Sequence, residues 1–161
     1  MEYTKLGTSD LTVSRLCLGC MSLGDASKGM HTWAVPYEES KEIIGYAYEN
    51  GINFFDTAMG YQDGTGEQFL GRAIKELGIR DKVVLATKYM PRSGEELLQK
   101  YSGVEWIEKC LDDSLARLEA DHIDLYIMHA WDYRTPVLDT LETLTKALKA
   151  GKIRADRKSI V

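Results

Sequence analysis

The sequence predicts an α/β protein built from four consecutive βα units around a parallel sheet. Short apolar runs alternate with amphipathic segments of about ten to fifteen residues, and each run precedes one such segment, which is the pattern of repeated βα units. A length of 161 residues and a hydrophobic content of 44% are sufficient for one globular domain with a substantial core.

Four apolar runs are the predicted strands, and a hairpin precedes them. The strands are expected at residues 15–18, 53–56, 83–87 and 123–129. Residues 3–16, YTKLGTSDLTVSRL, predict two short strands around a turn at 7–10. Such a hairpin can close one end of a barrel.

Each predicted strand is followed by a helix, and capping residues indicate where the helices begin and end. The residues that predict these boundaries are Pro36 and Gly51 for the first helix, Thr65 with Gln68 for the second, Ser102 with Glu105 for the third, and Thr135, Pro136 and Gly151 for the fourth. The third helix has the most regular pattern. Its apolar face is formed by Ile107, Cys110, Leu111, Leu115 and Leu118.

Charge and hydropathy exclude several classes of partner. The formal net charge is −5, and acidic and basic residues are mixed along the chain, so neither nucleic acid nor a membrane surface is an expected partner. No signal peptide opens the sequence, and its apolar runs are far shorter than the ~20 residues that span a bilayer. We expect a cytoplasmic protein that binds a small soluble molecule.

The three cysteines do not form a recognisable metal or redox motif. Cys17 and Cys20 make a single C-x-x-C without a second pair, and Cys110 is distant in sequence. Because the pair falls within an apolar run, SRLCLGCM, we interpret both residues as small buried hydrophobes.

Polar residues follow the predicted strands at their carboxyl ends, where parallel βα proteins bind ligands. Asp56, Lys88 and His129 end the second, third and fourth strands, and Tyr61 lies in the loop after the second. Each residue alone has a structural explanation, such as capping a turn or filling a core. Their convergence on one rim favours a functional site.

These four residues can deliver a proton to a carbonyl oxygen. A phenol with a pKa near ~10 is a poor proton donor at neutral pH unless its anion is stabilised. The ammonium of Lys88 can stabilise the anion of Tyr61, and Asp56 can hold Lys88 in place. His129 can donate a hydrogen bond to a substrate oxygen. The group contains no electron source, so a hydride has to come from a cofactor, and nicotinamide is the usual one.

Several segments together resemble the aldo-keto reductase family. Residues 51–75, GINFFDTAMGYQDGTGEQFLGRAIK, and residues 114–129, SLARLEADHIDLYIMH, are similar to the two family signatures. Residues 5–21, KLGTSDLTVSRLCLGCM, and residues 83–88, VVLATK, fit the same family. The likeness is to the bacterial branch related to potassium-channel β subunits and aryl-alcohol dehydrogenases, and it extends from about residue 3 to residue 154.

The resemblance implies a TIM-type (β/α)8 barrel that reduces an aldehyde or ketone with NADPH and without a metal. The catalytic residues of the family correspond to Asp56, Tyr61, Lys88 and His129. Further residues that the resemblance implies are Gly19, Cys20, Met21 and Asp56 near the nicotinamide ribose, and Trp33 and Trp131 as walls of the substrate pocket.

The resemblance also predicts that this chain is half of a barrel. A TIM barrel usually needs about 250 residues, and only four βα units are recognisable. After Arg154 the charged run Asp156, Arg157 and Lys158 is a poor buried strand, so we divide the chain into a half-barrel, 1–154, and a divergent tail, 155–161. We expect a truncation or frame change after Arg154.

Two expectations follow from a half-barrel. The family's pyrophosphate and adenine contacts fall in the second half, so we expect this chain to bind NADPH poorly. The first and fourth strands would be open edges, and we expect the chain to self-associate through them.

Two other functions remain open at this point. A metal-dependent hydrolase also carries Asp, Lys and His at strand ends, although such sites generally use several histidines and this chain has three. A binding or redox-sensing subunit without catalysis can keep the same fold and residues.

Overall fold

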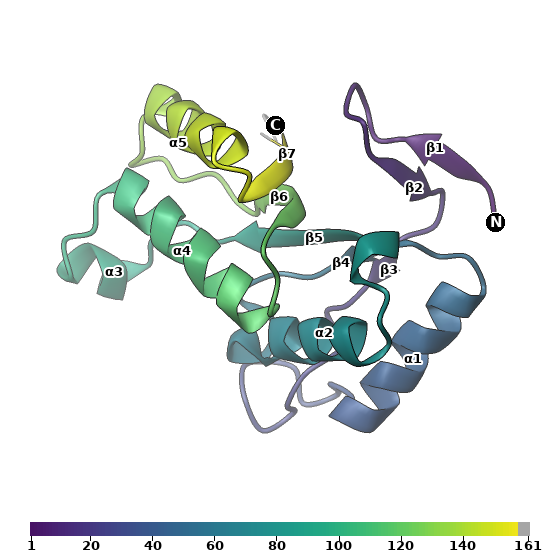
Figure 1. Ribbon diagram of the computed structural model, residues 1–161. Coiled ribbons are helices and arrows are strands. Elements are labelled where there is room, and N and C mark those ends of the chain that lie inside the picture. Colours follow the sequence, from purple (N-terminus) through teal and green to yellow (C-terminus); the bar gives the residue numbers. More distant parts are fainter. Residues whose placement is uncertain (158–161) are drawn as a thin grey trace.

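The computed structural model describes residues 1–157 and consists of a parallel five-stranded sheet, helices that pack on it, and an antiparallel hairpin (Figure 1). The strands are β1 Tyr3–Lys5, β2 Thr12–Ser14, β3 Leu18–Gly19, β4 Phe54–Asp56, β5 Val84–Tyr89, β6 Ile123–Met128 and β7 Ile153–Arg157. The α-helices are α1 Tyr37–Glu49, α2 Thr65–Glu76, α3 Gly94–Leu98, α4 Gly103–Arg117 and α5 Val137–Lys149. Residues 1–157 also contain two 3₁₀ helices, η1 Tyr61–Gly64 and η2 Arg80–Lys82.

The sheet has the order β3-β4-β5-β6-β7, in which each strand pairs in parallel with the next strand of the sheet. This order confirms the four βα units predicted from the sequence. The first strand is shorter than expected, because residues 15–17 are exposed and stay outside the sheet.

The fifth strand, β7, was not expected. Asp156 lies opposite Tyr126 of β6, so the charged run after Arg154 does form a strand as far as residue 157. The prediction against a strand applied the rule for strands buried on both faces, whereas β7 is at an edge of the sheet. The open edges of the described sheet are therefore β3, which is the predicted first strand, and β7, which takes the place of the predicted fourth strand. The remainder of the predicted tail, 158–161, lies outside the described residues.

The sequence predicts a hydroxyl side chain as the N-cap of three helices, and the structure confirms one of the three. Ser102 and Glu105 form the predicted capping box of α4. Thr65 does not cap α2, because its hydroxyl donates to the carbonyl of Gln62. Thr135 does not cap α5, because its hydroxyl donates to Asp132. At both positions a bond to the residue three positions earlier replaces the cap.

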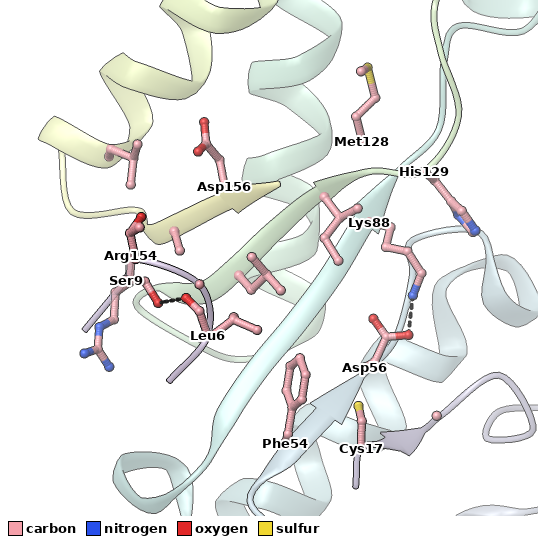
Figure 2. A pocket seen from close by; sticks show the side chains of 17 residues that line it. Leu6, Ser9, Cys17, Phe54, Asp56, Lys88, Met128, His129, Arg154 and Asp156 are labelled. Atoms are coloured by element: carbon pink, nitrogen blue, oxygen red, sulfur yellow. Dashed lines mark hydrogen bonds and ion pairs between the residues drawn. The ribbon is translucent and has the colours of Figure 1, made fainter. Parts of the chain in front are cut away.

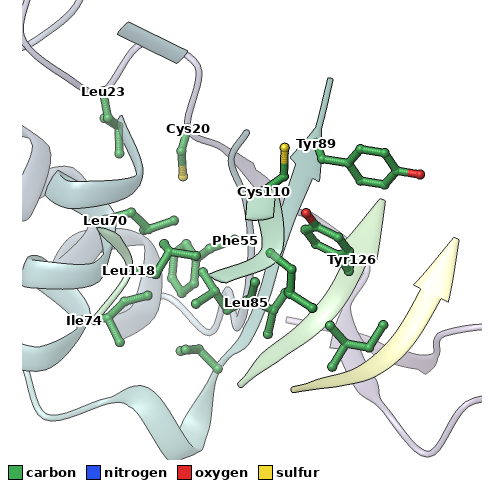
Figure 3. Packing of buried hydrophobic residues seen from close by; sticks show 14 of the residues in the cluster. Cys20, Leu23, Phe55, Leu70, Ile74, Leu85, Tyr89, Cys110, Leu118 and Tyr126 are labelled. Carbon is green, nitrogen blue, oxygen red and sulfur yellow. The ribbon is translucent and has the colours of Figure 1, made fainter. Parts of the chain in front are cut away.

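The main core lies between the sheet and its helices (Figure 3). Phe55, Leu85 and Tyr126 face the helices from β4, β5 and β6, and all three are fully buried. Cys20 and Cys110 belong to this core, as predicted. Cys17 is exposed, so its interpretation as a buried hydrophobe was wrong.

The hairpin of β1 and β2 lies at the amino ends of the strands, and Figure 1 shows it across β5 from α2. Leu11 and Val13 of the hairpin pack with Val84 at the start of β5. Asn53 fixes the hairpin to the start of β4, because its side chain accepts from the backbone of Ser14 and donates to Thr12. The amino ends of the strands are thereby closed, as the sequence predicts, and the carboxyl ends stay accessible.

Gly71 on α2 tests how tightly the helices pack. A Cβ at this position would stand 2.2 Å from the carbonyl oxygen of Leu118, and a backbone atom cannot easily move away. We expect Gly71→Ala to lower the free energy of unfolding by about 1–3 kcal/mol, measured by urea denaturation.

Gly94→Ala is the matched control, because a Cβ at Gly94 would meet nothing within 4 Å. It should leave stability unchanged or raise it by up to about 1 kcal/mol through better helix propensity. Equal stability of the Gly71→Ala variant and the parent would contradict the described packing of α2 against the end of α4.

Candidate active site

An ion pair between Lys88 and Asp56 is the centre of the candidate site. Asp56 ends β4 and lies opposite Ala86 of β5, so Lys88 is two residues further along the neighbouring strand, on the same face. Lys88 Nζ lies 2.6 Å from Asp56 Oδ2 and donates a second hydrogen bond, 2.7 Å long, to the carbonyl of Thr57. These two bonds fix the position of the ammonium at the rim.

Tyr61 and His129 lie on the same rim. The ammonium of Lys88 is 5.2 Å from the centroid of the Tyr61 ring, which is within the range of a cation–π contact. The rings of Tyr61 and His129 meet edge to face with their centroids 6.0 Å apart. The structure therefore brings together all four residues that the sequence predicts.

The surroundings keep His129 in its neutral form. Burial, followed by the positive charge of Lys88, lowers the pKa of His129 below its usual value, and the weaker effect of Asp56 opposes the shift. At neutral pH the ring therefore has one N–H that can donate a hydrogen bond to an oxygen, and one unprotonated nitrogen.

A cavity of about 1000 Å³ begins at this rim and extends along the sheet toward the hairpin (Figure 2). Asp56, Lys88 and His129 contribute to its walls at the rim end. Apolar residues of the strands, including Phe54 and Ile127, line the remainder. The cavity thus combines a few ionisable groups with an apolar wall, as small-molecule sites commonly do.

The strand β3 leaves space for a ligand beside Asp56. Gly19 lines the cavity, and a Cβ placed on it would meet nothing within 4 Å. Met21 is exposed at the same end of the strand. The side chain of Cys20 is fully buried, its backbone N–H donates to the carbonyl of Asp56, and its carbonyl accepts from the N–H of Leu23, so only the second lone pair of that carbonyl remains for a ligand. This cradle is compatible with the ribose and nicotinamide end of a dinucleotide.

The two tryptophans do not line this cavity. Trp33 is 54% exposed and stacks on His31 at a centroid distance of 4.6 Å. Trp131 packs partly against the main core and meets Tyr133 edge to face. Their role as pocket walls therefore stays a prediction.

Gln62 is a positioning residue that the sequence did not reveal. Its buried side chain donates to the carbonyls of Lys28 and His31, each at 2.8 Å, and accepts from the backbone N–H of His31. Both Gln62 and Asp63 have a left-handed backbone, with φ of 50° and 51°, which costs energy in a residue other than glycine. These contacts hold the turn that carries Tyr61 against the long loop after β3.

Arg92 fixes the rim on its other side. Its guanidinium donates to Thr135 at 3.0 Å and to the carbonyl of Tyr101 at 2.8 Å, and it pairs with Asp132 at 3.3 Å. The side chains of Arg92 and Asp132 are each 7% exposed. The pair connects the loops after β5 and β6, the first of which begins two residues after Lys88 and the second at His129.

Residues 1–157 contain neither a candidate membrane-spanning helix nor a candidate metal site. None of the helices in this range is long and apolar enough to span a bilayer. In the same range, no group of three or more His, Cys, Asp or Glu side chains is arranged to hold a metal ion.

The fold and the rim together define a βα-barrel type of protein with ionisable groups at the carboxyl ends of its strands. The sequence matches the aldo/keto reductase family over residues 15–155, and the chain belongs to this family.

Curated relatives show the same likeness over part of their length. The chain is 37% identical to aldo-keto reductase YhdN of Bacillus subtilis, over 96% of this chain and 46% of that protein. It is 35% identical to the aryl-alcohol dehydrogenase [NADP(+)] of Phanerodontia chrysosporium, over 89% of this chain and 40% of that protein. The chain thus spans about half the length of the curated relatives that it matches.

Solved structures agree with the fold. Aldo-keto reductase AKR11C1 from Bacillus halodurans, in its holo form, superposes with a TM-score of 0.76 at 38% identity, over 97% of this chain and 49% of that one. An aldo/keto reductase from Klebsiella pneumoniae, solved with NADP and acetate, gives a TM-score of 0.73 at 29% identity, over 90% of this chain and 45% of that one.

A titration of His129 tests the electrostatics of the rim. Lys88→Met removes a positive charge near the ring and leaves Asp56 unpaired, and both changes favour the protonated imidazole. We therefore expect the pKa of His129 to rise, measured by NMR from the ring proton signals.

Lys109→Met is the control, because Lys109 pairs with Asp113 on α4 rather than with the rim. It should leave the titration of His129 unchanged. A lower or unchanged pKa of His129 in the Lys88→Met variant would contradict the described placement of the ammonium.

Proposed function

We propose that this chain carries the catalytic rim of an NADPH-dependent reductase that converts an aldehyde or ketone to an alcohol. The observation that carries the proposal is the Lys88–Asp56 ion pair, with its ammonium directed toward the ring of Tyr61 and with His129 on the same rim. Membership of the aldo/keto reductase family supports the same reaction.

Each residue of the rim has its own role in the transfer of a proton to the substrate. Tyr61 donates its phenolic proton to the carbonyl oxygen of the substrate. The ammonium of Lys88 stabilises the phenolate that remains, and Asp56 together with the carbonyl of Thr57 keeps that ammonium in position. His129, neutral at physiological pH, donates a hydrogen bond to the same carbonyl oxygen and orients it.

NADPH, when bound, supplies the hydride that the side chains lack. Gly19, the carbonyl of Cys20, Met21 and Asp56 are the residues that would contact its nicotinamide end. The space above Gly19 and its position on the cavity wall support this assignment.

The proposed substrate is a small carbonyl compound. We propose Trp33 and Trp131, in the loops after β3 and β6, as walls of the substrate pocket above the rim, because the apolar residues below the rim face the interior of the barrel, which side chains fill. A cytoplasmic location and self-association also stay predictions, and the strands available for self-association are β3 and β7.

Tyr61→Phe tests the proposed proton donor. We expect NADPH oxidation with 4-nitrobenzaldehyde when this chain is extended by an intact second half of the barrel, and little or none with the 161 residues alone. In the extended protein, Tyr61→Phe should reduce turnover by about 10²-fold or more, because it removes the proton that general acid catalysis needs.

Tyr133→Phe removes the hydroxyl of a tyrosine that is 89% exposed, and it serves as the control that should retain activity. Equal turnover by the Tyr61→Phe variant and the parent would remove Tyr61 from the mechanism. Binding of NADPH without any turnover in the extended protein would favour the non-catalytic binding subunit.

A further inference from the structure

The long loop between β3 and α1 is closed at its base. Leu23 pairs with Val35 in a short parallel bridge, and the N–H of Val35 donates to the carbonyl of Ser22 at 2.7 Å. Beyond this base, residues 25–33 are all partly or fully exposed. The outer part of the loop can therefore open about its base unless another segment of the protein holds it.

The buried side chain of Gln62 is the centre of the contact between this loop and the turn after Tyr61. Its amide N–H groups donate to the carbonyls of Lys28 and His31, each at 2.8 Å, and its oxygen accepts from the N–H of His31. A third carbonyl, that of Asp25, lies 3.4 Å from the same amide nitrogen. Since the amide has only two hydrogens, both are engaged when the loop is docked on the turn.

Two neighbours of Gln62 extend the contact. Asp63 Oδ2 accepts from the N–H of Gly29 at 3.0 Å, and Thr65 Oγ1 accepts from the N–H of Asp25 at 2.9 Å. Each of these bonds joins a side chain of the turn to the backbone of the loop. The loop backbone therefore finds in the turn the partners that water would otherwise supply.

The two segments also approach each other closely at glycines. A Cβ on Gly29 would stand 2.8 Å from the Cα of Gln62, and a Cβ on Gly24 would stand 2.8 Å from the side chain of Gln62. Both glycines have a positive φ, 64° at Gly29 and 134° at Gly24. A residue with a side chain at either position would hold the loop away from the turn.

The turn has a strained backbone that the docked loop stabilises. Gln62, Asp63 and Gly64 follow one another with φ of 50°, 51° and 85°. Two consecutive residues other than glycine in the left-handed region persist only where surrounding contacts fix them. The side chains of these same two residues bind the loop, so release of the loop should let the turn relax and move Tyr61.

We propose that the loop of residues 25–31 is a positioning element for Tyr61. When the loop is docked, the strained turn keeps the ring of Tyr61 beside Lys88 and His129. When the loop is released, the turn relaxes and the ring leaves this place. Docking of the loop and alignment of the ring are thus coupled, and each favours the other. The importance of the loop for proton transfer rests on the proposed function, whereas the coupling itself does not.

Gly29→Ala tests the coupling from the side of the loop. Two NMR measurements on the 161-residue chain follow it: hydrogen exchange of the His31 amide, and NOEs between the rings of Tyr61 and His129, whose centroids are 6.0 Å apart. We expect the amide to exchange at least tenfold faster than in the parent and the NOEs to disappear, because the added methyl group separates the loop from the turn.

Gly78→Ala is the matched control. Gly78 has a similar φ of 65°, and a Cβ there would meet nothing within 4 Å, so this variant has comparable backbone strain without a contact at the turn. It should exchange the His31 amide at the rate of the parent and keep the NOEs between the two rings.

Gln62→Glu provides a second test that does not change the size of the side chain. A carboxylate cannot donate to the carbonyls of Lys28 and His31, and its oxygens repel them. Both NMR measurements should change as for Gly29→Ala while circular dichroism still shows a folded chain. Gln68→Glu is its control, because Gln68 is exposed on α2, and it should behave as the parent does.

Three results would overturn the proposal. One is the absence of the NOEs between the two rings in the parent. Another is a change of one NMR measurement without the other in either folded variant, which would make the loop and Tyr61 independent. The third is an unchanged exchange rate in the Gln62→Glu variant. The expected NMR changes without any turnover of the extended protein would support the coupling and contradict the proposed function, so the two failures are distinguishable.

Discussion

The ion pair between Lys88 and Asp56 is the interaction on which the rest of the site depends. It forms because β4 and β5 are adjacent parallel strands, so that residues at their carboxyl ends meet on one face. The two side chains are only 11% and 30% exposed, so each charge is partly removed from water and needs its partner. The ammonium has a second bond to the carbonyl of Thr57, and its remaining side is directed toward Tyr61. A lysine held in this way supplies positive charge at one place rather than over a range of rotamers.

Hydrogen bonds between β5 and the helices behind it explain why the four rim residues keep their positions. Glu67 on α2 is fully buried; it accepts from Thr87, the neighbour of Lys88, and from Arg117 on α4. This network connects β5 to two helices directly behind the ion pair. In front, Gln62 and Arg92 hold the loops on the two sides of the rim. Residues that bind or react are most precise when packed elements and satisfied hydrogen bonds restrict them, and both conditions are met at this rim.

Sequence reasoning located the strands, the hairpin and the four rim residues, because apolar runs mark strands and the ends of parallel strands converge. It failed where a contact distant in sequence decides the structure. The hydroxyls of Thr65 and Thr135 accept from the backbone of Asp25 and from Arg92, which are 40 and 43 residues away in sequence, instead of capping helices. β7 is charged because it lies at an edge, and an edge cannot be recognised before the order of strands is known. The left-handed backbone of Gln62 was invisible for a similar reason, since only the loop that it binds stabilises that conformation.

A double-mutant cycle on Asp56→Asn and Lys88→Met, followed by urea unfolding, tests the central claim most directly. The two side chains are in contact at 2.6 Å and mostly buried, so the effects of the single substitutions should not add. We predict a favourable coupling free energy of about 0.5–3 kcal/mol, the range for residues in one ion pair. Additivity within about 0.3 kcal/mol would mean that the two charges do not interact, and it would contradict the dependence of the rim on this ion pair.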